Sequence, residues 1–125
     1  MRSRILFTLC FISVLVGQPS FTASSITTSA NGARDVYAVD IDSDGDMDMV
    51  TCSSLDNTVA WYENNGSQSF TKNSISTSQN SPNSVFACDL DADGDVDILV
   101  CSNNDDTVNW YENNGAADPS FTANT

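Results

Sequence analysis

The sequence DLDADGDVDILV, residues 89–100, is the most informative stretch of this chain. It places an aspartate at every second position from 89 to 97 and then continues into three apolar residues. An earlier stretch, DIDSDGDMDMV at residues 40–50, repeats the arrangement. Like charges at this spacing repel one another and strands disfavour aspartate, so both stretches need a partner that offsets the repulsion.

The two aspartate stretches belong to an internal repeat of 49 residues. Residues 20–66 and 69–115 agree at 27 of 47 positions without a gap, and the residues SFT begin a third copy at position 120. Repeats of this length indicate an array of similar structural units. The sequence therefore divides into a leader over 1–19, a first repeat over 20–68, a second repeat over 69–119 and the start of a truncated third repeat over 120–125.

Each copy predicts four short strands rich in valine, isoleucine, threonine and aromatic residues. In the first copy we expect strands at 36–40, 48–52 and 58–63, preceded by an outer strand that carries Phe21 and Ile26. The second copy predicts the same four strands 49 residues later. Four-stranded units at this spacing are typical of β-propeller blades, so the expected fold is all-β with two four-stranded propeller-type blades, a partial propeller. A β-sandwich built by duplication is the alternative.

The aspartates of each stretch predict a calcium site. Calcium takes six to eight oxygen ligands, and carboxylates in a tight loop supply them. Gly45 and Gly94 occupy the sixth place of D-x-D-x-D-G-D-x-D, where the chain has to turn sharply around the ion. A solvated acidic strand and a disordered acidic linker are the alternatives, although the apolar runs on both sides argue against a linker. Magnesium fits less well because it keeps more of its own water.

The place of each aspartate in its loop predicts its role, with about one Ca²⁺ per repeat and two in the chain. Side-chain ligands are expected at Asp40, Asp42, Asp44 and Asp48 in the first loop and at Asp89, Asp91, Asp93 and Asp97 in the second. Asp46 and Asp95 hold the seventh place, where a main-chain carbonyl usually binds, so we expect their carboxylates to face water. Thr51 and Val100 stand where an EF-hand has a bidentate glutamate, so neither loop is an EF-hand.

This pattern resembles the FG-GAP or VCBS-type repeats. The resemblance rests on the aspartate loop, the apolar strand after it, TVxWYENNG and SFT, and it covers about residues 20–125. It implies integrin-alpha-like β-propeller blades, one per repeat, with calcium in the loop between the first two inner strands. It also implies use in adhesion or ligand binding, and some members carry or accompany carbohydrate-active enzymes. Closed propellers need about four to eight blades, so we expect either the remaining blades of a longer parent protein or self-association of copies.

The charge of the chain excludes several classes of function. The sequence has 17 acidic residues, 4 basic residues and no histidine, which gives a net charge of −13. Such a surface repels nucleic acid and anionic membranes. Because histidine is absent and the aspartates are assigned to ions, the chain lacks an evident general base and an electrophilic partner, and we expect no enzymatic activity.

Residues 1–19 predict a secretory signal peptide. Arg2 and Arg4 precede an uncharged apolar run over residues 5–16, which is shorter than the roughly twenty residues of a membrane-spanning helix. An uncleaved anchor or a chance apolar start is the alternative. We therefore expect a secreted or cell-surface protein, extracellular or periplasmic, with no membrane span in the mature chain.

Three cysteines follow the predicted signal peptide, an odd number for an oxidising compartment. Cys52 and Cys101 each end an apolar run, so we expect both to be small buried side chains. The sequence leaves the oxidation state of Cys52, Cys88 and Cys101 open.

Two aromatic pairs, WY at residues 61–62 and 110–111, suggest either a sugar-stacking platform or core packing. Alternation along a strand buries one member of each pair, which favours packing. The neighbouring Glu63 and Glu112 are interpreted as surface charges. We predict a secreted calcium-binding β-propeller repeat module for adhesion or for binding a protein or carbohydrate ligand, with no ligand-binding residue assigned. The alternative is the non-catalytic propeller portion of a larger carbohydrate-active enzyme.

Overall fold

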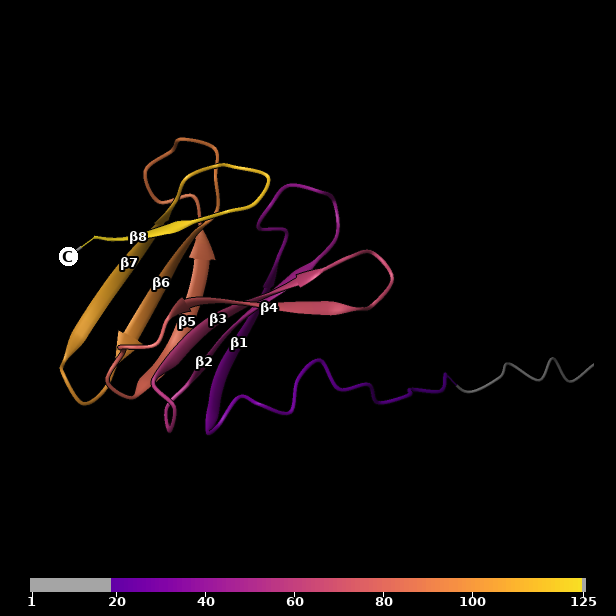
Figure 1. Cartoon of the computed structure of the whole chain (residues 1–125), viewed down its shortest axis with the longest axis horizontal. Helices are drawn as coiled ribbons and strands as arrows, with labels where there is room; N and C mark the ends of the chain where they lie inside the picture. Colours follow the sequence, from indigo (N-terminus) through magenta and orange to yellow (C-terminus); the bar gives the residue numbers. More distant parts are fainter. Residues whose placement is uncertain (1–18, 125) are drawn as a thin grey trace, which may run out of the picture.

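The computed structural model describes residues 19–124, which form two antiparallel sheets of four strands each (Figure 1). The first sheet contains β1 (Ala33–Val39), β2 (Asp48–Ser53), β3 (Thr58–Asn64) and β4 (Phe70–Ser76). The second contains β5 (Pro82–Cys88), β6 (Asp97–Ser102), β7 (Thr107–Asn113) and β8 (Phe121–Asn124). Neighbouring strands in each sheet are consecutive in the sequence, and residues 19–124 contain no helix. The all-β prediction of two four-stranded blades in an open, partial propeller is confirmed.

The sheets are offset from the sequence repeat by one strand. Phe70 and Ile75, which the repeat assigns to the second copy, lie on β4 and complete the first sheet. The SFT motif at the start of the third copy likewise forms β8 and completes the second sheet. The expected outer strand with Phe21 and Ile26 is wrong, because β4 occupies the edge of β3 in the first sheet, and this segment leads into β1 as an extended chain (Figure 1). Phe21 is 94% exposed there.

The two sheets repeat the same register. In the first, Val50 of β2 stands opposite Trp61 of β3, and in the second Leu99 of β6 stands opposite Trp110 of β7. A register shift also recurs at the start of each sheet, in β1 after Ala33 and in β5 after Pro82. The repeated sequence therefore dictates repeated pairing, down to the position of the irregularity.

The core lies between the sheets, where one face of the first packs against one face of the second. Strand β5 contacts both β1 and β2 and brings the sheets together. The buried side chains of this core are Ile41, Val50, Cys52, Val59 and Trp61 from the first half and Val85, Ala87, Ile98, Val100 and Tyr111 from the second. Burying valine- and isoleucine-sized side chains contributes about 1.5–3 kcal/mol each, so this shared layer is the main stabilising feature of the pair.

The three described cysteines are free thiols with different surroundings. Cys52 is fully buried as expected, and burial raises the pKa of its thiol to about 11. The same expectation is wrong for Cys101, which is exposed because the second sheet turns that face outward. The predicted signal peptide lies outside the described residues, except for Pro19. Among residues 19–124 there is no helix long and apolar enough to cross a membrane.

Candidate metal centres

The two aspartate stretches form equivalent loops at the same end of the two sheets (Figure 1). The first joins β1 to β2 and the second joins β5 to β6. Each loop thus connects the first two strands of its sheet. Asp48 and Asp97 end the loops and are also the first residues of β2 and β6.

In the first loop three carboxylates converge. One oxygen from each of Asp40, Asp42 and Asp48 lies within 4.8 Å of the other two. The carboxylates also organise the backbone of the loop: Oδ2 of Asp40 accepts the N–H of Gly45 at 3.1 Å, and Oδ1 of Asp42 accepts the N–H of Asp44 at 3.2 Å. The chain therefore curls around the carboxylates and directs them inward.

In the second loop the converging carboxylates are those of Asp89, Asp91 and Asp93, again within 4.8 Å of one another. Oδ2 of Asp89 accepts the N–H of Gly94 at 3.1 Å, as in the first loop. Taken together, the two groups use the first, third, fifth and ninth places of the motif. These are the four places that the sequence assigned to side-chain ligands. Asp44 lies outside the first group and Asp97 outside the second.

Glycine is required at the sixth place because of the backbone conformation there. Gly45 has φ of 96° and Gly94 has φ of 102°, a region that side-chain-bearing residues rarely adopt. A Cβ on either glycine would meet no other atom within 4 Å, so the requirement is conformational and not steric. The turn expected from the motif is present in both loops.

The last aspartate of each loop is a buried carboxylate that holds the backbone together. Asp48 is 0% exposed, and its two oxygens accept the N–H groups of Ile41 at 3.1 Å and Asn64 at 2.8 Å. Asp97, at 1% exposure, repeats this with the N–H groups of Leu90 at 3.2 Å and Asn113 at 2.9 Å. These two aspartates therefore fix the loop to the end of the third strand of their sheet.

The Asn-Asn-Gly turns form a support for the loops that sequence reasoning did not identify. The amide of Asn64 donates to the carbonyl of Met47 at 3.1 Å, and the amide of Asn113 donates to the carbonyl of Val96 at 3.1 Å. Both asparagines also accept the N–H of the glycine two residues later. The signal was present in the sequence, since NNG stands at the same place in both copies.

The carboxylates at the seventh place point toward these turns. A Cβ on Gly66 would lie 2.5 Å from Oδ2 of Asp46, and a Cβ on Gly115 would collide with Asp95. Both aspartates are half-buried. Their carboxylates thus lie against the glycine of the turn, where the sequence interpretation had them facing water.

The aspartates at the third place of each loop, Asp42 and Asp91, have raised pKa values. Burial raises the pKa of Asp42 above its ordinary value, and the nearby Asp48, Asp44 and Asp40 carboxylates raise it further. The hydrogen bond from the N–H of Asp44 lowers the pKa but does not cancel these effects. The pKa of Asp91 moves in the same direction, first through desolvation in the loop and then through Asp93 and Asp97. Desolvation and neighbouring like charges both disfavour the ionised carboxylate, and a cation in the loop would offset both effects.

The donor set fits a hard cation. It consists of carboxylate oxygens, which are calcium ligands, and the sequence contains no histidine that would favour a transition metal. Oδ1 of Asp40 is buried and has no hydrogen-bond partner in the described part of the chain. A buried acceptor without a partner costs about 1–3 kcal/mol, and a cation between the converging oxygens would satisfy it.

The aromatic pairs mainly pack. Trp61 and Tyr62 are 1% and 2% exposed and Tyr111 is 5% exposed, so these three offer no platform for a sugar. The expectation that one member of each pair is buried holds for the second pair, where Trp110 is partly exposed. It is wrong for the first pair, because the whole of β3 from Thr58 to Tyr62 is buried.

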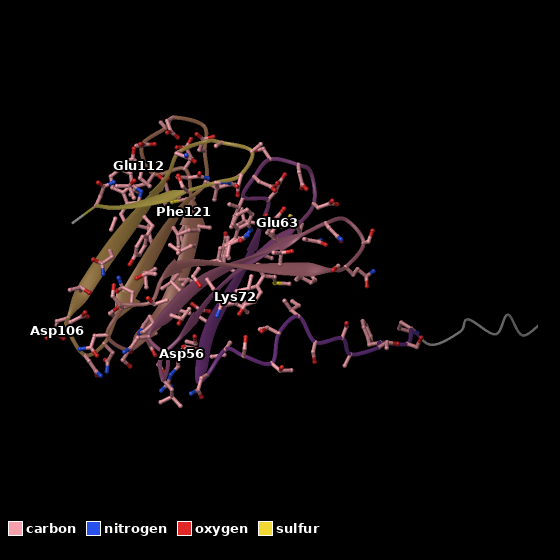
Figure 2. The ribbon with its side chains drawn as sticks, viewed as in Figure 1. Asp56, Glu63, Lys72, Asp106, Glu112 and Phe121 are labelled. Carbon is pink, nitrogen blue, oxygen red and sulfur yellow. The ribbon has the colours of Figure 1, made fainter. Side chains whose placement is uncertain are left out.

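The glutamates beside the aromatic pairs stay on the surface, at the same end as the aspartate loops (Figure 2). Glu63 accepts a hydrogen bond from the Asn73 amide at 3.4 Å, and Glu112 accepts one from the Asn124 amide at 2.6 Å. Asp56 and Asp106 lie at the opposite end, in the turns that follow β2 and β6 (Figure 2). The glutamates thus serve as polar cross-strand contacts.

Comparison with known protein families gives one match, to the FG-GAP-like repeat, over residues 40–100. This span begins at the first aspartate loop, includes the second and ends in β6. Comparisons with curated proteins and with solved structures gave no significant match. The matched span, the two blade-like sheets and the repeated loop are consistent with an FG-GAP-type repeat protein.

Proposed function

We propose that this chain is a calcium-binding β-propeller repeat module that acts outside the cytoplasm in adhesion or ligand binding, without catalysing a reaction. One Ca²⁺ would bind in each aspartate loop. The observation that carries the proposal is the convergence of three carboxylates in each loop, together with the partnerless oxygen of Asp40.

Four aspartate side chains of each loop would bind the ion. The side chains of Asp40, Asp42, Asp44 and Asp48, and of Asp89, Asp91, Asp93 and Asp97, supply oxygens. Bound calcium supplies a positive charge that offsets the repulsion among the carboxylates. Because the last aspartate of each loop also holds the third strand, an ion in the loop would stabilise the sheet as well as the loop.

The expected effect on stability is large enough to measure. A site occupied at a hundred times its dissociation constant adds about 2.7 kcal/mol to the free energy of unfolding, and two independent sites add about twice that. In a domain of this size about 1 kcal/mol shifts the melting temperature by roughly 4–8 °C. We therefore expect millimolar calcium to raise the melting temperature by at least about ten degrees over excess chelator. Magnesium should have a much smaller effect, because it keeps more of its own water.

The experiment is a thermal melt of the full chain in calcium, in magnesium and in chelator, with calorimetric titration of calcium to give the number of sites. The variant Asp42→Asn/Asp91→Asn should lose most of the calcium response. Its matched control is Asp106→Asn/Asp118→Asn, which removes the same charge from aspartates outside the loops and should keep that response. Identical melts in calcium and chelator would reject the calcium proposal, as would a stoichiometry other than two.

The adhesion and ligand-binding part of the proposal rests on the repeat family and on the predicted signal peptide. The partner is a protein or a carbohydrate, and the surface of the loop end is the place where we expect it to bind. Screening the calcium-loaded chain against a glycan array tests the carbohydrate case. Binding that disappears in chelator would support a loop-end site, and retention of no glycan would leave protein ligands for a pull-down from the cell surface.

A further inference from the structure

The chain contains one packed interface between two repeated sheets, and the repeat defines the same two faces a second time. We name the leading face of a sheet as the one that carries positions equivalent to Val50, Cys52, Val59 and Trp61. The trailing face carries positions equivalent to Val85, Ala87, Ile98 and Val100. Within the chain the leading face of the first sheet packs on the trailing face of the second.

The leading face of the second sheet is open. Its residues are Leu99, Cys101, Val108 and Trp110, which the register pairs across β6 and β7 as Leu99 with Trp110 and Cys101 with Val108. Val59 in the packed interface is 0% exposed, whereas Val108 at the same place in the repeat is 69% exposed. An apolar side chain of this size is therefore presented to solvent at a position whose counterpart is fully buried.

The trailing face of the first sheet is open along β1, whereas Ala60 and Tyr62 of β3, on the same face, are buried. Its residues Val36 and Thr51 pair across β1 and β2, as do Ala38 and Met49. Val36 is 58% exposed, whereas its counterpart Val85 is 5% exposed. Each open face thus corresponds, residue for residue, to a face that is covered elsewhere in the same chain.

Both open faces carry a hollow at positions whose counterparts in the repeat are buried. A hollow of about 410 Å³ beside β1 is lined by Ala30, Ala33, Val36 and Thr51 among others. The counterparts of these four residues on the second sheet are Gln79, Pro82, Val85 and Val100, and all four are buried. A second hollow of about 350 Å³ lies on the other open face, over Leu99, Val108 and Trp110.

The polar contacts at the rim of the packed interface also have counterparts on the open faces. Across the packed interface Asn57 accepts the N–H of Ser81 at 3.0 Å, and the amide of Asn113 donates to the carbonyl of Ile41 at 3.5 Å. In the repeat, the counterparts of Asn57 and Ser81 are Asp106 and Gly32, which again are an oxygen acceptor and a backbone N–H. The counterparts of the Asn113 amide and the Ile41 carbonyl are the Asn64 amide and the Leu90 carbonyl.

We propose that the leading face of the second sheet binds the trailing face of the first sheet on another copy of this chain. The surface that each open face fits is present on the chain itself, with the residue types that already pack together once. Such an interface is heterologous, so successive copies add head to tail until the rotation closes a ring. Propellers close with about four to eight blades, and with two sheets per copy the ring would hold about two to four copies.

The experiment is sedimentation velocity on the full chain in calcium over a wide range of concentration. The wild type should form a closed species of two to four copies. Val108→Asp places a charge on the leading face and Val36→Asp places one on the trailing face. Each variant alone should therefore remain monomeric. Mixed in equal amounts, the two variants should form a dimer that grows no further, because each retains the face that the other has lost.

Ala117→Asp is the matched control. Ala117 is exposed in the turn between β7 and β8, outside both faces, so the change adds the same charge away from the proposed interface. The control should assemble as the wild type does. Circular dichroism verifies folding, and Ala38→Asp and Cys101→Asp on the same two faces replace a variant that fails to fold. A wild type that stays monomeric, a Val36→Asp variant that still assembles, or a mixture that yields no dimer would each overturn the proposal.

Discussion

At the scale of single residues, the loops contain two kinds of aspartate. The first kind is half-buried or exposed and converges on the centre of the loop, as Asp40, Asp42 and Asp91 do. The second kind is buried, and Asp48 and Asp97 use both oxygens to accept backbone N–H groups. The motif uses one residue type for two tasks, and Asp48 performs both, so spacing alone could not show which aspartates also hold the backbone.

Replacing Asp48 with asparagine tests the structural task. The amide keeps one acceptor and turns an NH₂ group toward a backbone N–H, so one buried donor loses its partner. We expect the free energy of unfolding to fall by about 1–3 kcal/mol. Urea denaturation in excess chelator measures this loss without any contribution from calcium. Asp118→Asn, on an exposed loop, removes the same charge and should change stability by less than about 0.5 kcal/mol. Equal values for the two variants would contradict the structural role of Asp48.

At the scale of elements, the connection between the sheets carries a polar cluster that only one copy of the repeat has. Gln79 is 7% exposed, and its amide donates to the hydroxyl of Tyr111. Its carbonyl oxygen accepts from Ser102 at 2.6 Å and from Asn109 at 2.9 Å. One side chain therefore links β6 and β7 to the segment that leads into β5. The equivalent residue of the first copy is Ala30, which cannot make these bonds.

Gln79→Ala should destabilise the second sheet. The change leaves the Ser102, Asn109 and Tyr111 side chains without this partner, and we expect a loss of about 2–3 kcal/mol in the free energy of unfolding. Hydrogen exchange of β6 and β7 amides would locate the loss. Asn104→Ala removes an exposed amide from the neighbouring turn and should cost less than about 0.5 kcal/mol. A loss spread evenly over both sheets would contradict the assignment of Gln79 to the second one.

The strands were predictable from the sequence to the extent that their pairing is local. Strands β1 to β3 follow from alternating apolar residues between turn clusters, and the loop positions follow from D-x-D-x-D-G-D-x-D. The place of the outer strand was not predictable, because SFT carries the same residues wherever it occurs and only a free sheet edge decides its partner. For this reason Phe70 completes the sheet before it in the sequence, whereas Phe21 has none. The exposure of Cys101 escaped prediction in the same way, since it depends on which face meets another sheet.

At the scale of the whole molecule, the two sheets are held together by an apolar layer and by a carboxylate at its edge. Asp35 of β1 accepts hydrogen bonds from the Ser84 hydroxyl at 2.8 Å and the Val85 N–H at 3.1 Å, both on β5 of the other sheet. The counterpart of Asp35 in the second sheet is Ser84 itself. A hydrogen bond to a charged acceptor contributes more than one between neutral groups, so this contact favours the observed packing of one sheet on the other.

The ionised state of Asp35 gives this contact a pH dependence. The pKa of Asp35 is lowered below its ordinary value, mainly by the hydrogen bond from the Ser84 hydroxyl and then by that from the Val85 N–H. Burial raises this pKa, but by less. A carboxyl group with a lowered pKa in the folded state adds stability above its unfolded pKa, about 3.9, and loses it as the pH falls through the folded value. Asp35→Asn should therefore be less stable than the wild type at pH 7, and the difference should shrink as the pH falls below about 4. Denaturant unfolding of both chains between pH 7 and pH 2.5, in chelator, measures that difference.

Asp118→Asn, measured in parallel, should show no comparable convergence with the wild type at low pH, since its carboxylate is on an exposed loop away from the interface. A gap between Asp35→Asn and the wild type that stays constant down to pH 2.5 would mean that the contact acts through shape and not through charge.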